Sequence, residues 1–214
     1  MTIRRRAMMG SGAALLLTGG APLPVPDANK LLFQIVRGGG VIGSHRLDFV
    51  GSGSDLSVNV NVVMAISFGP IPLFHYHHHA VENWQGGECV SLEAETDHNG
   101  TKFKLVAHRD ASGWEVTGSK GNLRAPPETL PATHWNKAML NGPMINTETG
   151  SVMRPEIAEL GWQKITAAGG GTIIAEHYRL SGDADMDTWY DNSPSWAGAE
   201  FKGGDGSTIR YIKA

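Results

Sequence analysis

The chain has 214 residues, of which 41% are hydrophobic and 18% charged, and this ordinary globular composition excludes an intrinsically disordered protein. Its net charge of −3, without a basic stripe, argues against nucleic acid as a partner. The single cysteine, Cys89, cannot form an internal disulfide, so the fold must be held together by its core alone.

The first 28 residues have the pattern of a targeting segment. Arg4–Arg6 form a charged start, and residues 13–17 form a short apolar run. The pair Arg5-Arg6 resembles the centre of a twin-arginine export signal. The apolar run is too short to anchor the protein permanently in a bilayer. We therefore predict a signal peptide over residues 1–28, a periplasmic or otherwise exported location, and a single β domain over residues 29–214.

From residue 31 onward the dominant hydrophobic period is two, which is typical of half-buried strands. In residues 56–62, leucine and valine alternate with serine and asparagine, as expected of an antiparallel sheet packed on one face. Turn signals separate the strand-like segments, and the Asn99-Gly100 pair is one that tight hairpins favour. The other predicted strands lie within residues 31–36, 41–50, 74–84, 89–96, 102–109, 114–118, 144–153, 163–166, 172–180, 186–191, 196–202 and 208–212.

Residues 122–143 interrupt this pattern. The Pro126-Pro127 pair cannot lie in a central strand, and residues 133–140 could form about two helical turns. We therefore predict an all-β fold: a strongly curved antiparallel sheet, forming a half-barrel or a partly closed barrel, with one short helical insertion near residues 130–142.

Four groups of residues carry a resemblance to a known family. They are Tyr76–Trp84 with Gly87–Leu92, Glu95–Gly100, Leu130–Asn136 with Asn146–Gly150, and Trp189–Asp191 with Gly204–Tyr211. With these groups the chain resembles the exported bacterial family called domain of unknown function 6134. It is more distantly similar to the periplasmic family called domain of unknown function 3108. The resemblance to the second family implies a curved antiparallel sheet wrapped around an apolar groove, and neither resemblance implies an activity.

The most conspicuous motif is a run of histidines at positions 75 and 77–79. On a strand, His75, His77 and His79 would share one face at intervals of about 6.5–7 Å, and His78 would point to the other face. Two histidines that share one face of a strand often supply two of the ligands of a Zn, Cu or Fe ion. Such a site would need a third ligand from another strand, such as His45, His98, Glu93 or Asp97. The alternative, which we favour, is that these histidines line a solvated polar face of the sheet.

A second motif, Thr133–Asn136, lies in the insertion, where a loop could cap the mouth of a half-barrel. His134 could act there as a general base with Asn136 as its orienting partner. The alternative, which we favour, is that Trp135 plugs the open end while His134 and Asn136 tie the loop to the sheet by hydrogen bonds.

The leading functional hypothesis is a carrier that binds a small apolar molecule or lipid in the concave face of the sheet. An envelope protein is a further candidate partner. The expected ligand-binding residues are Phe74, Tyr76, Trp84, Trp135, Trp162 and Trp189. One alternative is a metal-binding protein or metalloenzyme that uses His75, His77 and His79 with Zn or Cu, and another is an acid–base enzyme centred on His134 and Asn136. The sequence favours a binding protein without a cofactor over an enzyme.

Overall fold

The computed structural model describes residues 23–214, so residues 1–22 of the predicted targeting segment over residues 1–28 lie outside the described residues. Thirteen strands form one antiparallel sheet in the order β12-β13-β14-β15-β16-β1-β2-β3-β4-β5-β6-β7-β8. Their bounds are β1 (Lys30–Arg37), β2 (Gly40–Ser52), β3 (Asp55–Phe68), β4 (Ile71–Gln85), β5 (Glu88–His98), β6 (Thr101–Asp110), β7 (Gly113–Gly118), β8 (Gly121–Ala125), β12 (Glu156–Thr166), β13 (Thr172–Ser181), β14 (Met186–Asp191), β15 (Trp196–Lys202) and β16 (Thr208–Lys213). Because β1 pairs with both β2 and β16, the first strand joins the two halves of the sheet.

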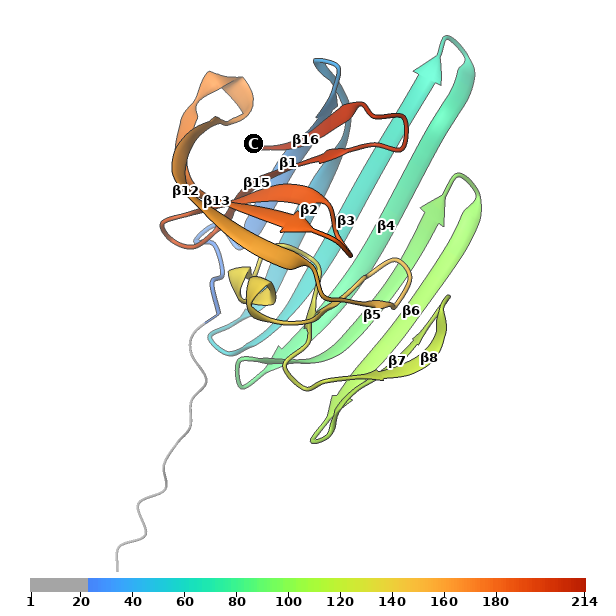
Figure 1. Cartoon of the computed structure of the whole chain (residues 1–214), viewed down its shortest axis with the longest axis vertical. Coiled ribbons are helices and arrows are strands. Elements are labelled where there is room, and N and C mark those ends of the chain that lie inside the picture. The colour runs from blue at the N-terminus through green and yellow to red at the C-terminus, as the bar shows by residue number, and fades with distance from the viewer. Residues whose placement is uncertain (1–22) are drawn as a thin grey trace, which may run out of the picture.

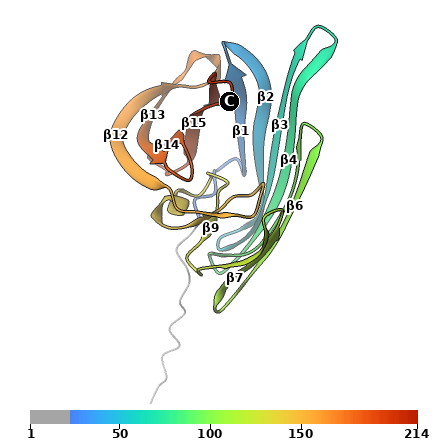
Figure 2. The same cartoon turned by 45° about the vertical axis from the view of Figure 1, so that its right-hand side comes forward.

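The sheet is strongly curved and open. Strands β2–β8 form a broad wall, and β12–β16 curl around the opposite side (Figures 1 and 2). Within residues 23–214 the edge strands β12 and β8 do not pair with each other. Five register shifts, in the pairs β1–β2, β3–β4, β4–β5, β12–β13 and β14–β15, accompany this curvature, because β-bulges bend strands. The predicted all-β fold is confirmed.

Strand β3 shows why this sequence forms such a wall. Val58, Val60 and Val62 point into the core, while the residues between them face outward and are less buried. The hairpin that joins β5 to β6 also follows the sequence. Asn99 and Gly100 adopt positive φ angles of 51° and 87°, the left-handed pair that a two-residue hairpin turn requires.

The insertion differs in detail from the prediction. The helical part is one short 3-10 helix, η1 (Lys137–Asn141), rather than two turns over residues 133–140. His134 has a φ of 68°, which a right-handed helix does not accommodate, and so η1 begins only after it. Within residues 23–214, no helix is long and apolar enough to cross a bilayer.

The predicted strand over residues 144–153 is also divided. It forms β10 (Met144–Ile145) and β11 (Val152–Met153), and β10 pairs with both β11 and β9 (Leu130–Pro131) in a separate small sheet. The Asn146 side chain accepts hydrogen bonds from the backbone N–H groups of Glu148 and Thr149, at 2.9 and 3.0 Å. Such an Asx turn replaces the extended backbone between the two short strands.

A buried carboxyl group fastens the insertion to the wall. Glu82 on β4 is fully buried, and its Oε2 accepts hydrogen bonds from the indole N–H groups of Trp84 (2.8 Å) and Trp135 (3.1 Å). Burial raises the pKa of the Glu82 carboxyl. The ring of Trp135 also packs edge-on against Trp84 and Phe49, each at 5.2 Å. These contacts hold the loop that carries His134 against the concave face.

Candidate ligand cavity

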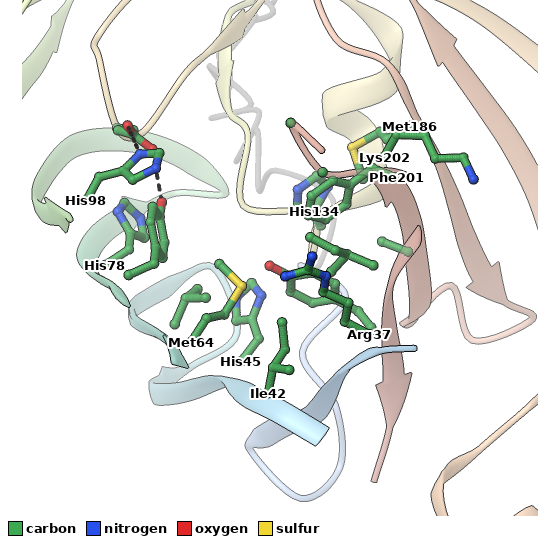
Figure 3. A pocket seen from close by; sticks show the side chains of 18 of the residues that line it. Arg37, Ile42, His45, Met64, His78, His98, His134, Met186, Phe201 and Lys202 are labelled. Carbon is green, nitrogen blue, oxygen red and sulfur yellow. Dashed lines mark hydrogen bonds and ion pairs between the residues drawn. The ribbon is translucent and has the colours of Figure 1, made fainter. Parts of the chain in front are cut away.

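A cavity of about 790 Å³ lies on the concave face, between the β2–β4 part of the wall and strands β14–β16 (Figure 3). This volume is within the range of small-molecule sites in proteins. Its lining is mainly apolar, with a few polar side chains. The apolar side chains that line it include Ile42, Val60, Val62, Met64, Ile66, Phe74, Met186, Trp196, Phe201, Ile209 and Tyr211.

His45 on β2 is one of the most enclosed polar groups of the lining, with only 4% of its surface exposed. Its ring lies 5.1 Å from that of Trp196 and 5.5 Å from that of Tyr211. Neither ring nitrogen has a hydrogen-bond partner within the protein. Burial, and then the nearby His134 and His78, hold the pKa of His45 well below its ordinary value. The imidazole is therefore neutral near pH 7 and carries one unused donor and one unused acceptor.

His134 reaches the same indole from the insertion. Its ring stacks on that of Trp196, with centroids 5.1 Å apart and an interplanar angle of 24°. Burial lowers the pKa of His134 to about 4, and its Nδ1 atom has no partner. The Trp196 indole is itself fixed, because its N–H donates to the carbonyl oxygen of Gly198 at 2.9 Å. His45 and His134 are thus two neutral imidazoles held against one rigid aromatic ring.

His78 on β4 also lines the cavity and is as buried as His45, but unlike His45 it has hydrogen-bond partners for both nitrogens. Its Nδ1 lies 2.8 Å from Thr96 Oγ1, and its Nε2 lies 3.2 Å from Thr147 Oγ1. Burial, followed by the neighbouring His79 and His77, lowers the pKa of His78 to about 4. His78 therefore links the wall to the loop between β10 and β11.

The same loop brings a carboxylate to the cavity. Glu148 Oε2 accepts a hydrogen bond from the Tyr76 hydroxyl at 3.2 Å, and its Oε1 lies 3.4 Å from His98 Nδ1 (Figure 3). The side chain of Glu148 is mostly buried, whereas that of His98 is 44% exposed. This carboxylate is thus engaged with groups on β4 and β5.

The six expected ligand-binding aromatics are dispersed. Phe74 and Tyr76 line the cavity. Trp84 and Trp135 are buried in the core, where both bond to Glu82. Trp162 on β12 is 54% exposed, and Trp189 on β14 stacks on His177 at 4.7 Å. Neither Trp162 nor Trp189 is among the residues that line the cavity.

The histidine run alternates as expected on a strand. His75, His77 and His79 lie on the outer face of β4, and His78 lies on the cavity face. His75 Nε2 is 3.2 Å from Asp97 Oδ1. His79 Nδ1 is 3.0 Å from Asn61 Oδ1.

The candidate third metal ligands are divided between the two faces of the sheet. His45 and His98 line the cavity, whereas Asp97 lies on the outer face, where it also forms an ion pair with Lys102. Glu93 is exposed on β5 and pairs in register with Val81, two positions after His79. Among residues 23–214, no group of three or more His, Cys, Asp or Glu side chains is placed to hold a metal ion.

The Asn136 side chain caps the helix η1 instead of bonding to His134. Its Oδ1 accepts a hydrogen bond from the backbone N–H of Ala138 at 3.0 Å, which caps η1. Lys137 forms an ion pair with Glu176 on β13 at 2.5 Å, which ties the insertion to the second half of the sheet. The structure therefore brings His134 to the cavity without Asn136 as its orienting partner.

Several cavity residues were not expected from the sequence. Met64 is the next inward-facing position after Val62 in the alternating pattern of residues 56–62. Extending that pattern by two residues would have predicted it as a cavity residue. Trp196, Phe201 and Tyr211 come from strands near the C-terminus, and no local pattern indicates that they line the same cavity as residues of β2. Glu148 lies in a motif that carries the family resemblance, but its place in the cavity depends on the loop conformation.

A known protein family matches most of the chain in sequence. The model of a family described as Domain of unknown function (DUF6134) matches residues 33–214, a range that includes every residue lining the cavity. The chain belongs to this family. No curated protein matches this DUF6134 chain in sequence.

One solved structure is similar to this DUF6134 protein: the crystal structure of a beta-barrel-like protein of domain of unknown function DUF1849 from Brucella abortus. The TM-score is 0.62 at 10% sequence identity, and the alignment covers 86% of this chain and 94% of that chain. At this identity the likeness concerns the fold alone. The more distant similarity to domain of unknown function 3108 stays a prediction.

Proposed function

We propose that this DUF6134 protein is an exported carrier that binds a small apolar molecule, such as a lipid, in the cavity of its concave face. The observation that carries the proposal is the cavity of about 790 Å³, whose walls are mainly apolar and include a small number of convergent polar groups. This combination is typical of small-molecule sites, in which apolar walls supply affinity and a few polar groups orient the ligand.

The walls suit a ligand with an alkyl chain or a ring system. Ile42, Met64, Phe201 and Ile209 approach from strands on both sides of the cavity. Each methylene group that moves from water to such a wall contributes about 0.8 kcal/mol. Because the lining comes mostly from paired strands, the site is preformed, and little conformational entropy is lost when a ligand binds.

The location forms part of the proposal. Export is supported by the charged start and short apolar run within residues 1–28. An exported carrier would exchange its ligand with the cell envelope, and an envelope protein is the proposed partner for that exchange. Fractionation of cells, with the mass of the mature protein measured by mass spectrometry, tests this part: full-length protein in the cytoplasm would contradict it.

A cavity-filling variant tests the binding site. Ile42→Trp adds a large side chain to the lining. Val63→Trp is the matched control, because Val63 lies on the outer face of neighbouring β3 and is 46% exposed. The neutral fluorescent probe N-phenylnaphthylamine serves as ligand, and apolar molecules that copurify are extracted and identified by mass spectrometry. We expect Ile42→Trp to weaken probe binding by about tenfold or more, a difference of about 1.4 kcal/mol, and Val63→Trp to bind as the unmodified protein does.

Two results would contradict the carrier function. The first is an unmodified protein that binds no probe and copurifies with no apolar molecule. The second is equal probe binding by the Ile42→Trp and Val63→Trp variants, which would place the probe elsewhere on the surface.

A further inference from the structure

The charges that line the cavity are unevenly placed. The two cations, Arg37 and Lys202, lie at the ends of β1 and β15. Arg37 forms an ion pair with Asp205, and the Lys202 ammonium donates to Thr208 Oγ1 at 2.6 Å. Both cations therefore already have partners at exposed strand ends.

His45, His78 and His134 form the polar wall of this cavity, and the two cations of the lining, Arg37 and Lys202, are already engaged by Asp205 and Thr208. His45, His78 and His134 are neutral near pH 7, because burial lowers the pKa of each. A carboxylate or phosphate brought to this wall would leave water without meeting a cation that is free of a partner. Such an uncompensated burial of charge is strongly unfavourable.

The carboxylates of the lining also have partners. Glu148 accepts the Tyr76 hydroxyl and lies beside His98. Asp185 is bonded to Arg179 at 2.6 Å, and Asp205 to Arg37. A ligand ammonium group would have to compete with these contacts, and beside His45 and His134 it would meet only neutral rings.

What the wall lacks is a partner for His45. Both of its ring nitrogens are buried without a hydrogen bond, and Nδ1 of the nearby His134 is in the same condition. An unsatisfied buried polar group is costly, and a neutral imidazole offers one donor and one acceptor. A hydroxyl or a primary amide placed between the two rings can accept a hydrogen bond from the N–H of one imidazole and donate one to the unprotonated nitrogen of the other.

We infer that the cavity selects apolar ligands whose polar end is uncharged and hydrogen-bonding, such as a hydroxyl or primary amide, and that this end binds between His45 and His134. The inference rests on the proposed carrier function and specifies its ligand class. The alkyl part of the ligand then lies along Met64, Ile209 and Phe201.

The test uses four ligands with one and the same alkyl chain, ending in a hydroxyl, a primary amide, a carboxylate or a primary ammonium group. Each competes with N-phenylnaphthylamine for the purified protein at pH 7.5. We expect the alcohol and the amide to bind at least about tenfold more tightly than the two charged ligands. A carboxylate or ammonium ligand that binds as tightly as the alcohol overturns the inference while the carrier function stands. Failure of all four, together with the probe, overturns both.

Two variants locate the polar end. His45→Phe keeps a ring at this position but removes both nitrogens, and the alcohol should lose most of its advantage over the charged ligands. His79→Phe makes the same change on the outer face of β4 and should leave the ranking of the four ligands unchanged. If His45→Phe keeps the full preference for the alcohol, the assigned position is wrong. The ranking in the unmodified protein does not depend on how well either variant folds.

Discussion

The two faces of β4 place the same residue type in opposite surroundings. On the outer face, His75 and His79 meet Asp97 and Asn61 beside solvent. On the inner face, His78 is 4% exposed and is enclosed between Thr96 and Thr147, and its pKa falls to about 4. Residues that are adjacent in sequence thus have different chemistry, because alternation sends them to different faces of one sheet.

This comparison has a consequence for the choice of site. The outer histidines form the conspicuous motif, but they lie on a solvated surface. The inner histidines come from three separate segments of the chain, and they converge on a cavity. For this curved sheet, the face on which a histidine lies is a better guide to a candidate site than the number of histidines that are adjacent in the sequence.

The largest expected difference between the faces concerns a buried charge. His78→Lys would place an ammonium group in an enclosed site without a counter-charge and should lower the free energy of unfolding by about 3–5 kcal/mol. His77→Lys, one position away on the exposed face, should change it by about 0.5 kcal/mol or less. Urea denaturation of both variants measures the change in the free energy of unfolding. Equal decreases in the two variants would contradict the different enclosure of the two faces.

The pH dependence of stability gives the next largest effect. Unfolded His78 takes up a proton near its ordinary pKa of 6.5, whereas the folded protein holds this pKa at about 4. Between these values the unfolded state binds more protons, so stability falls as the pH falls. At pH 4.5 the contribution of His78 is a loss of about 2–3 kcal/mol relative to pH 7.5.

The His78→Gln variant isolates that contribution from those of the carboxylates. Glutamine can still bond to Thr96 and Thr147 but does not titrate, so the loss of stability between pH 7.5 and pH 4.5 should shrink by about 2–3 kcal/mol. His77→Gln is the control and should lose stability with pH as the unmodified protein does. An unchanged pH profile in His78→Gln would mean that its imidazole titrates normally in the folded state.

Metal binding is where we expect the smallest effect. The protein purified without a polyhistidine tag should retain no stoichiometric zinc or copper after dialysis, and a variant with both His77→Ala and His79→Ala should behave in the same way. The reason is that, within residues 23–214, the histidines of the outer face do not meet a third ligand in a suitable arrangement. One equivalent of metal that the double variant loses would establish the metal-binding alternative.

Part of the fold and a smaller part of the site could be predicted. The alternation in β3, the hairpin at Asn99-Gly100 and the opposite directions of His77 and His78 depend on neighbouring residues only, and the structure has all three. The segment from residue 133 to residue 153 was less predictable. Its path depends on the bond between Trp135 and Glu82 and on the Asx turn at Asn146, and the first of these joins residues far apart in the chain.

The sequence by itself determined that the chain forms strands and, away from the β-bulges, which residues of a strand share a face, because the two-residue period is a local property of the extended backbone. Only the tertiary structure decided that His45, His134 and Trp196 meet, and that Trp84 and Trp135 belong to the core rather than to the cavity. These contacts require β2, the insertion and β15 to come together. That arrangement follows from the strand order and curvature of the whole sheet, which no short segment specifies.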